Sequence, residues 1–191
     1  MKETRIAEIR ASQPTAEGND ALILRGRPIL YETPTLITDG SGSYTEIIRS
    51  GALDSADLSD VRLLYNHDLA KVPLARTPKT MSLKVDNQGL SLEATLPDTA
   101  SAREVYEAVK RGDLSGMSFA FTVPEGGDDY DALTNTRTIR QIAKVYECSV
   151  VPYPAYPTTS VEARNVQAAA KTRLEERKKA KILFNQIMKE R

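Results

Sequence analysis

The chain has 191 residues, of which 40% are hydrophobic and 27% charged, a composition typical of a globular protein with about the size of one domain. Its 26 basic and 26 acidic residues cancel, which argues against a general polyanion binder, and its single cysteine excludes an intramolecular disulfide. One histidine and one cysteine also exclude a zinc site made of several His and Cys ligands. Neither a phosphate-binding loop nor a dinucleotide fingerprint occurs, so we expect no metal and no cofactor.

The distribution of charge and apolar residues suggests where the protein works. Residues 162–191 contain nine basic and four acidic residues, a net charge of +5, and the remainder has 17 and 22, a net charge of −5. An acidic body with a basic tail favours different partners for the two parts. No apolar run approaches the ~20 residues of a membrane helix, and the N-terminus MKETRIAEIR lacks a signal-peptide core. We therefore expect a cytoplasmic protein without a membrane segment.

The first part of the chain predicts strands behind a polar arm, residues 1–20. ALILRGRPILYE is extended in character, and Gly26 and Pro28 interrupt it as they do in a bulged strand. VRLLY is a buried strand by composition, and Asn66 and His67 stand at its end.

The middle of the chain carries the clearest local signals. MSLKVDNQGLSLEATLP predicts a hairpin whose inner face holds Leu83, Val85, Leu90, Leu92, Ala94 and Leu96. TASAREVYEAVKRGDL predicts one internal helix, capped at Thr99 or Ser101 and closed at Gly112. The apolar stripe of this helix consists of Ala102, Val105, Tyr106 and Val109.

The last part of the body predicts a strand over GMSFAFTV, a polar loop over PEGGDDYDALTNT and one long β segment over RTIRQIAKVYECSVV. From Ser160 onward the composition becomes helical and basic. The predicted fold class is therefore mostly β with α (α+β): an arm over residues 1–20, a body over 21–161 and a helical tail over 162–191.

Three residues of the body suggest chemistry, although each has a plain structural interpretation. Strand alternation places Ser118 on a small, polar face opposite Met117 and Phe119, and from this segment alone an ordinary outward-facing serine is favoured. His67, the one histidine, suits a general base, or simply a strand end bonded to its loop. Its parity with Leu63 and Tyr65 predicts a place at the rim of the body.

Glu147 interrupts an apolar β segment, where a carboxylate is costly unless it has a partner or faces water. A protonated imidazole would be such a partner, and an edge-strand position is the plain alternative. Cys148 is most simply a small buried residue. Cys148 is a less favoured nucleophile than Ser118. Neighbours in a strand point to opposite faces, so Cys148 and Glu147 cannot both face the histidine.

Five stretches occur together and in order: YTEIIRSGAL, LLYNHD followed by LART, GLSLEATLP, RGDLSGMSFAFTV and VYECSVVPYPAYPTTSVEAR. In these segments the chain resembles the prohead (capsid maturation) protease family of tailed phages. The resemblance implies an α+β protein built on a β-barrel similar to herpesvirus assemblin. It implies a serine endopeptidase that cleaves scaffold, or the scaffold-like N-terminal segment of the major capsid protein, inside the procapsid in the host cytoplasm. Self-cleavage and a homo-oligomer, with a dimer as the candidate state, are implied as well.

The same resemblance implies roles for single residues. Ser118 of GMSF corresponds to the nucleophile, His67 of NHD to the general base and Glu147 of YECS to the acid that orients the base. Assemblins place a second histidine at the third position, and this chain has none, so Asp68 remains the other candidate. For the oxyanion, backbone amides and the guanidinium groups of Arg137 or Arg140 stay open.

Other classes of function remain as alternatives. The body could be a non-catalytic assembly or scaffold protein that keeps the protease fold, or a hydrolase that uses Cys148. For the basic tail we favour docking to an acidic scaffold or capsid precursor over a surface helix packed on its own body. A specific nucleic-acid partner is not expected, since the tail lacks interleaved aromatic residues beyond Phe184.

Overall fold

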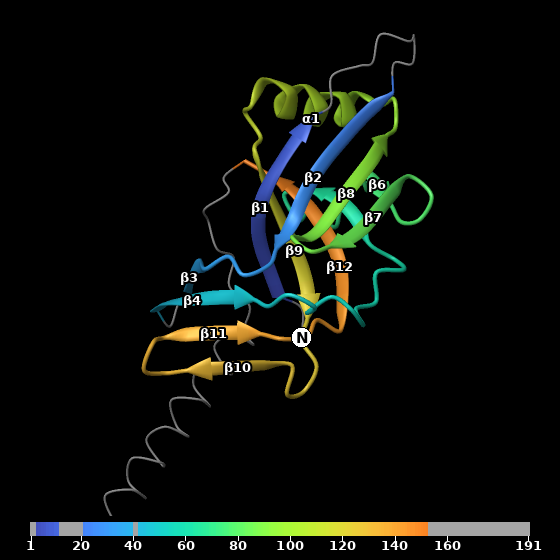
Figure 1. Cartoon of the computed structure of the whole chain (residues 1–191). Helices are drawn as coiled ribbons and strands as arrows, with labels where there is room; N and C mark the ends of the chain where they lie inside the picture. The colour runs from blue at the N-terminus through green and yellow to red at the C-terminus, as the bar shows by residue number, and fades with distance from the viewer. Residues whose placement is uncertain (1–2, 12–20, 40–41, 153–191) are drawn as a thin grey trace, which may run out of the picture.

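The computed structural model describes residues 3–11, 21–39 and 42–152 (Figure 1). These residues form twelve strands and one α-helix, so the prediction of a mostly β protein with one internal helix is confirmed. The predicted helical tail, residues 162–191, lies outside the described residues.

Eight strands form the larger sheet, in the order β6-β5-β12-β9-β1-β2-β8-β7. Their bounds are β1 Glu3–Ala11, β2 Leu22–Leu30, β5 Arg62–Tyr65, β6 Ala75–Arg76, β7 Met81–Asp86, β8 Gly89–Leu96, β9 Gly116–Thr122 and β12 Lys144–Val151. Neighbours run antiparallel except β5 and β12, which are parallel. Strand β12 therefore separates β9, which carries Ser118, from β5, which ends just before His67.

The larger sheet is open within the described residues. Hydrogen bonding ends at β6 on one edge and at β7 on the other, and these two strands do not pair. Closure of a barrel needs a continuous ladder around the sheet, and β6 has only two residues. The closed barrel implied by the family resemblance is thus not found in the part of the chain that the structure describes.

Four strands form the smaller sheet, in the order β10-β11-β4-β3, with bounds β3 Thr35–Asp39, β4 Gly42–Ile48, β10 Asp128–Asp131 and β11 Thr136–Ile139. It lies at one end of the larger sheet, and the helix lies at the other (Figure 1). Two predictions fail here. The acidic stretch expected to be a loop contains strand β10, and the single long β segment is divided into β11 and β12, which belong to different sheets. Local composition did not indicate the break because residues 140–143 contain neither glycine nor proline.

Helix α1, Ala100–Arg111, matches its prediction in detail. Thr99 is the N-cap and accepts a hydrogen bond from the Ala102 amide, which satisfies one of the free amides of the first turn. Gly112 ends the helix in the left-handed conformation, at φ 85°. The predicted apolar stripe is buried. No helix among the described residues has both the length and the apolarity needed to cross a bilayer.

Strand β1 is an element that the sequence did not predict. Glu3–Ala11 was assigned to a polar arm, yet it lies between β9 and β2 in the middle of the larger sheet. Strand β2 does carry the expected irregularity, a register shift between Gly26 and Ile29. In the predicted hairpin β7–β8, the inner face is buried along β8, but Val85 on the edge strand β7 is 37% exposed.

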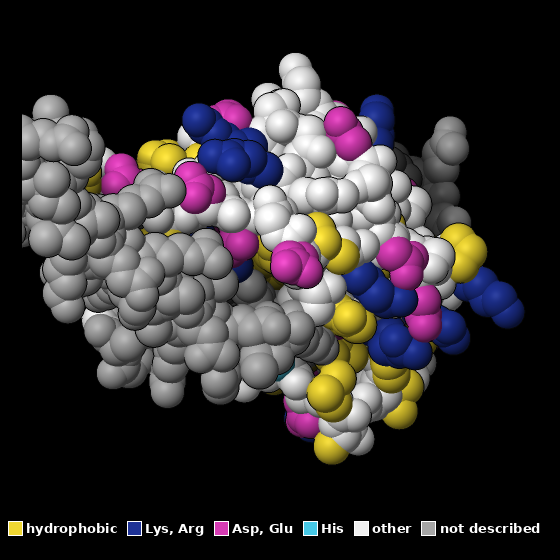
Figure 2. Space-filling view, turned by 90° about the horizontal axis from the view of Figure 1, so that it is seen from below, with side chains coloured by type: hydrophobic (Ala, Val, Ile, Leu, Met, Phe, Trp, Pro, Cys, Tyr) yellow, Lys and Arg dark blue, Asp and Glu magenta, His cyan; other side chains and the backbone are white. Residues whose placement is uncertain are grey.

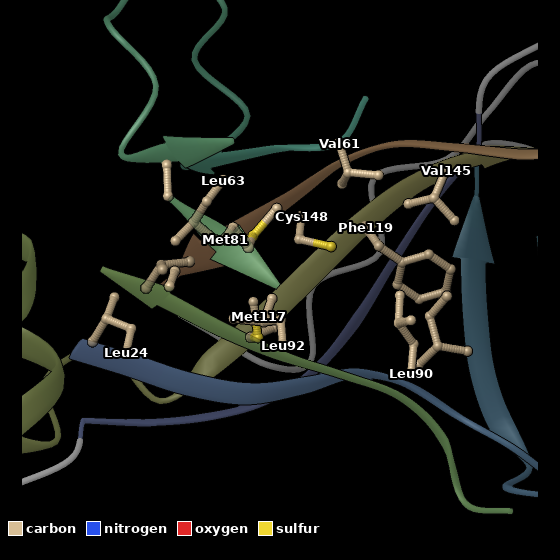
Figure 3. Packing of buried hydrophobic residues seen from close by; sticks show 14 of the residues in the cluster. Leu24, Val61, Leu63, Met81, Leu90, Leu92, Met117, Phe119, Val145 and Cys148 are labelled. Atoms are coloured by element: carbon tan, nitrogen blue, oxygen red, sulfur yellow. The ribbon is translucent and has the colours of Figure 1, made fainter. Parts of the chain in front are cut away.

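One hydrophobic core fills the concave side of the larger sheet (Figure 3). Met117, Phe119 and Phe121 of β9 point into it, and the rings of Phe119 and Phe121 stack with centroids 5.1 Å apart. Burial of each such side chain contributes roughly 1.5–3 kcal/mol. Because one face of β9 and β12 is committed to this core, the side chains of alternate residues lie on the opposite face.

Candidate active site

Three neighbouring strands bring the candidate residues to one face of the larger sheet. Ser118 of β9 and Ser149 of β12 are direct partners in the antiparallel ladder, so their side chains share a face, with Cβ atoms about 5 Å apart. Glu147 stands two residues before Ser149 on β12 and lies on that face too, as its hydrogen bond to Ser149 demonstrates. We call this surface of β9 and β12 the serine face.

The opposite face of the same strands is the core. Cys148 pairs with Phe119 on β9 and with Leu63 on β5, and its sulfur points among buried side chains (Figure 3). It has no exposure, and burial, with a smaller contribution from the neighbouring Glu147 charge, raises the pKa of its thiol far above the ordinary value. The prediction of a small buried residue is confirmed, and a thiolate nucleophile here is strongly disfavoured.

His67 reaches the serine face through a turn in left-handed backbone. Asn66 and His67 follow β5 with φ angles of 52° and 58°, a conformation that costs roughly 1–2 kcal/mol for a residue with a side chain. The Asn66 amide donates to the carbonyl of Val150 at 2.9 Å, which fixes the start of the turn against β12. Strand parity had placed His67 with Leu63 and Tyr65, and this expectation is wrong because the turn sends the ring to the other side.

The imidazole of His67 contacts the carboxylate of Glu147. His67 Nδ1 lies 2.7 Å from Glu147 Oε1, although the two residues are 80 positions apart in the chain. The Glu147 side chain is 4% exposed and the His67 side chain 27%. The alternative interpretation of Glu147 as an edge-strand residue that faces water is therefore wrong. Strand β12 lies inside the sheet, and the Glu147 carboxylate has a partner in His67. Within the described residues, Nε2 of His67 has no hydrogen-bond partner, which leaves that nitrogen for another group.

Ser118 is the third candidate residue on this face. It is 0% exposed, so the favoured interpretation as an outward-facing serine is wrong. Its hydroxyl has no hydrogen-bond partner within the described residues, and no hydrogen bond joins it to His67. Buried hydroxyls without partners are uncommon and call for an explanation, such as a chemical role.

Ser149 is a member of the cluster that sequence reasoning missed. Its hydroxyl donates to Glu147 Oε2 at 2.5 Å and accepts from the backbone amide of His67 at 3.2 Å. A signal was present in the sequence, because strand alternation places residue 149 on the same face as residue 147. The length of the β segment drew attention to its acid and its cysteine instead.

The remaining candidates are engaged elsewhere. The Asp68 carboxylate accepts from the Ala70 amide at 3.0 Å and lies 3.8 Å from the Lys71 ammonium group. Arg137 binds Glu46 and Asp128, and Arg140 binds Asp129. The structure thus brings Glu147, and not Asp68, to the His67 ring. It places both guanidinium groups on carboxylates of the smaller sheet.

A hollow of about 520 Å³ lies beside the loop that follows His67. Helix α1 and this loop enclose it, and its lining includes Tyr65, Val72, Glu104 and Leu114. His67, Glu147 and Ser118 are not among the lining residues, so the hollow is a neighbour of the cluster and not its mouth.

The face of the molecule in Figure 2 shows no separate charged site on its described part. On the described part of the face in Figure 2, basic and acidic side chains alternate, and no continuous patch of one sign is visible. Among the described residues, no group of three or more His, Cys, Asp or Glu side chains is arranged to hold a metal ion.

A serine hydroxyl, an imidazole and a carboxylate, supplied here by β9, by the turn after β5 and by β12, are the kinds of group that serine hydrolases use. The family model described as caudovirus prohead serine protease matches residues 7–176, and the chain belongs to that family. A curated relative, the prohead protease of Enterobacteria phage HK97, is 28% identical over 142 residues, which cover 72% of this chain and 61% of that protein. The chain thus spans less than two thirds of the length of this relative. No solved structure matches.

Proposed function

We propose that this protein is a serine endopeptidase of phage capsid maturation, with Ser118 as nucleophile, His67 as general base and Glu147 as the acid that orients the base. The observation that carries the proposal is the hydrogen bond between His67 and Glu147 on the face that also holds the buried hydroxyl of Ser118. Membership of the prohead serine protease family supports the same reaction class.

The mechanism follows from the proton positions that this contact favours. An ionised Glu147 accepts a hydrogen bond from the Nδ1–H of His67, which keeps that proton on Nδ1 and leaves Nε2 unprotonated and able to take the Ser118 proton. The serine oxygen attacks a peptide carbonyl, the amine leaves with the proton from Nε2, and water then hydrolyses the acyl-enzyme with His67 again as base. The hydrogen bond between Ser118 and Nε2 forms when substrate is bound, since such contacts tighten in the reacting complex.

Access to the nucleophile is part of the proposal. Because Ser118 has no exposure in this structure, a peptide reaches its hydroxyl only after the groups that cover it move. The exposed portion of the His67 ring marks the side from which a substrate approaches.

The substrate we propose is the major capsid protein precursor, at its scaffold-like N-terminal segment, or a separate scaffold protein. The name of the HK97 relative, a prohead protease, supports a substrate within the procapsid, and self-cleavage of the chain belongs to the same proposal. We propose that the enzyme acts as a homo-oligomer inside the procapsid in the host cell.

Co-expression with the cognate capsid precursor tests this function. Wild type and Ser118→Ala are compared by intact-mass spectrometry, which also maps the cleavage sites in the precursor and in the protease. Cleavage by wild type alone is expected. Equal cleavage by both proteins would remove Ser118 from the mechanism, and absence of cleavage by wild type, with a precursor that is cleaved during infection, would favour the assembly-protein alternative.

The basic tail, residues 162–191, has a separate proposed role: it docks the protease on an acidic scaffold or capsid precursor. A chain truncated before Ala168 is expected to keep its peptidase activity on a soluble precursor and to be lost from assembling capsids. Normal incorporation of the truncated protein would contradict the docking role.

A further inference from the structure

The hydroxyl of Ser149 contacts Glu147 and His67, two of the three other members of the cluster at the serine face. It donates to Glu147 Oε2 at 2.5 Å and accepts from the His67 amide at 3.2 Å, and the residue is fully buried. A single hydroxyl therefore joins the backbone of the proposed base to the carboxylate that orients it. Ser149 is not itself bonded to the imidazole ring.

The two oxygens of Glu147 have different partners. Oε1 lies against the ring of His67, and Oε2 takes the hydrogen bond from Ser149. Without the Ser149 hydroxyl, Oε2 would be a buried carboxylate oxygen with no donor in this group, and rotation of the carboxylate toward another donor would pull Oε1 off the ring. The hydroxyl therefore opposes the side-chain motion that would break the contact between Glu147 and His67.

The second contact of Ser149 acts on the backbone. His67 stands at φ 58°, in the left-handed region that residues with side chains rarely adopt. Its amide is held by Ser149, as the amide of Asn66 is held by the carbonyl of Val150. Both anchors come from β12, so that strand determines where the turn places the ring.

We propose that Ser149 is a positioning residue that fixes the Glu147 carboxylate and the His67 backbone together. This inference rests on the proposed function, because it gives the His67–Glu147 pair a supporting partner. Ser149 acts through these two residues and makes no contact with substrate. It also stands directly across from Ser118 in the ladder, so a change in the local packing of β12 is felt at the nucleophile as well.

A matched control is available in Thr77. Its hydroxyl is also buried and also accepts from a backbone amide, that of Val61 at 2.8 Å, just before strand β5. The Thr77 hydroxyl makes no hydrogen bond to His67, Glu147 or Ser118. Thr77→Val therefore removes a buried hydroxyl of similar structural importance, and the comparison separates general loss of stability from loss of positioning.

The first measurement needs no substrate. Because His67 is the one histidine of the chain, ¹⁵N-histidine labelling gives NMR signals of this ring alone. Wild type is expected to show a protonated Nδ1 with a proton that exchanges slowly with water. In Ser149→Ala that proton signal broadens or vanishes and the Nε2-protonated tautomer becomes populated, whereas Thr77→Val keeps the wild-type pattern. An unchanged tautomer and proton signal in Ser149→Ala would overturn the inference.

The second measurement is cleavage of the capsid precursor below the unfolding temperature of every variant. Ser149→Ala is expected to lower kcat/KM by roughly 10- to 100-fold, mainly in kcat, as substitutions that loosen a catalytic group do. Ser149→Thr keeps the hydroxyl and is expected to stay within about threefold of wild type. Where Ser149→Ala does not fold, the nearly isosteric Ser149→Cys, a weaker donor, provides the same test.

The outcomes separate this inference from the proposed function. Loss of cleavage in Ser118→Ala with full activity in Ser149→Ala would refute the positioning role alone. Full activity in Ser118→Ala would refute the proposed function, because the reaction would then need no hydroxyl at residue 118. Complete loss of activity in both Ser149→Ala and Ser149→Thr would refute the positioning role, because threonine keeps the hydroxyl. The two results together would refute both proposals.

Discussion

Two clusters of buried polar side chains, one in each sheet, differ in how completely their members are paired. In the smaller sheet, Arg137 is 1% exposed and its guanidinium lies 3.1 Å from Glu46 and 2.6 Å from Asp128. In the larger sheet, the ring of His67 has one nitrogen on Glu147 and one without a partner, and Ser118 close by has an unpaired hydroxyl, all within the described residues.

The difference separates structure from chemistry. The charge of a buried cation between two carboxylates is already compensated in the folded state, so such a cation is a poor binding group for a ligand. An imidazole held by one nitrogen still has a second nitrogen that can accept a proton. Unpaired polar groups in the interior are unfavourable for stability. Their presence at the serine face therefore favours a catalytic role over a structural one. Substitutions in the two clusters are expected to affect different properties of the protein.

The largest effect is expected for His67→Ala. Loss of the base should lower kcat by about four to six orders of magnitude, as removal of one member of a serine–histidine pair does. The partly exposed ring contributes little to the core, but its removal leaves Oε1 of the buried Glu147 without its partner, so the melting temperature should fall by several degrees. The measurement is cleavage of the capsid precursor next to a melting curve of the same sample. A stable variant with activity near wild type would contradict the assignment.

The next effect concerns the acid. Glu147→Gln keeps the shape of the side chain but removes the charge that favours the Nδ1-protonated ring, and kcat should fall by about 10²- to 10⁴-fold. Asp68→Asn is the matched variant, because Asp68 was the other candidate and its carboxylate binds the Ala70 amide instead. We expect this control to keep at least about half of the activity. A reversal of the two results would make Asp68 the third member.

In the smaller sheet the expected loss is one of stability. Arg137→Met leaves Glu46 and Asp128 without their cation, and removal of one partner from such a group costs about 3–5 kcal/mol. Urea unfolding measures this loss, and kcat/KM of the folded protein should stay within about twofold of wild type. Addition of Glu46→Gln and Asp128→Asn to the same chain should recover part of the stability. A large fall in activity at unchanged stability would show that Arg137 serves the reaction after all.

The smallest effect is expected at a half-buried pair that links β2 to the β7–β8 turn. Arg27 binds both oxygens of Asp86, at 2.6 and 2.8 Å, and with the Gln88 amide it lowers the pKa of Asp86 to about 2. The unfolded value is about 3.9, so this pair stabilises the fold above that pH and the contribution is lost as pH falls from about 5 to 2. The difference in melting temperature between wild type and Asp86→Asn should therefore narrow over this interval. A constant difference would show that the charge is not responsible.

The elements with local signals were predictable from the sequence. Thr99 and Gly112 bound helix α1, and Asn87–Gly89 marks the β7–β8 hairpin, because caps and tight turns depend on neighbouring residues alone. Strand β1 was missed because its polar sequence becomes a strand only by pairing with β9 and β2, which are distant in the chain.

For the site, residue types indicated the chemistry but not the geometry. Ser118, His67 and Glu147 were proposed as candidates from their types and from the family resemblance, whereas Ser149 was overlooked, although alternation places it with Glu147, and only its hydrogen bonds revealed it. The left-handed turn at Asn66 and His67 contains no glycine, so no local signal for it was present in the sequence. This turn places the His67 ring on the face opposite to the one that strand parity predicted. Tertiary contacts across about 80 positions of sequence decide both features.

The central claim is that His67 activates Ser118, and reaction with a fluorophosphonate probe tests it most directly. A wild-type preparation that cleaves the capsid precursor is treated with the probe and analysed by intact mass and peptide mapping. We expect one adduct, on Ser118, and no adduct in His67→Ala under the same conditions. An adduct on Ser149, an adduct on Ser118 that persists in His67→Ala, or no adduct on an enzyme that cleaves would contradict the account.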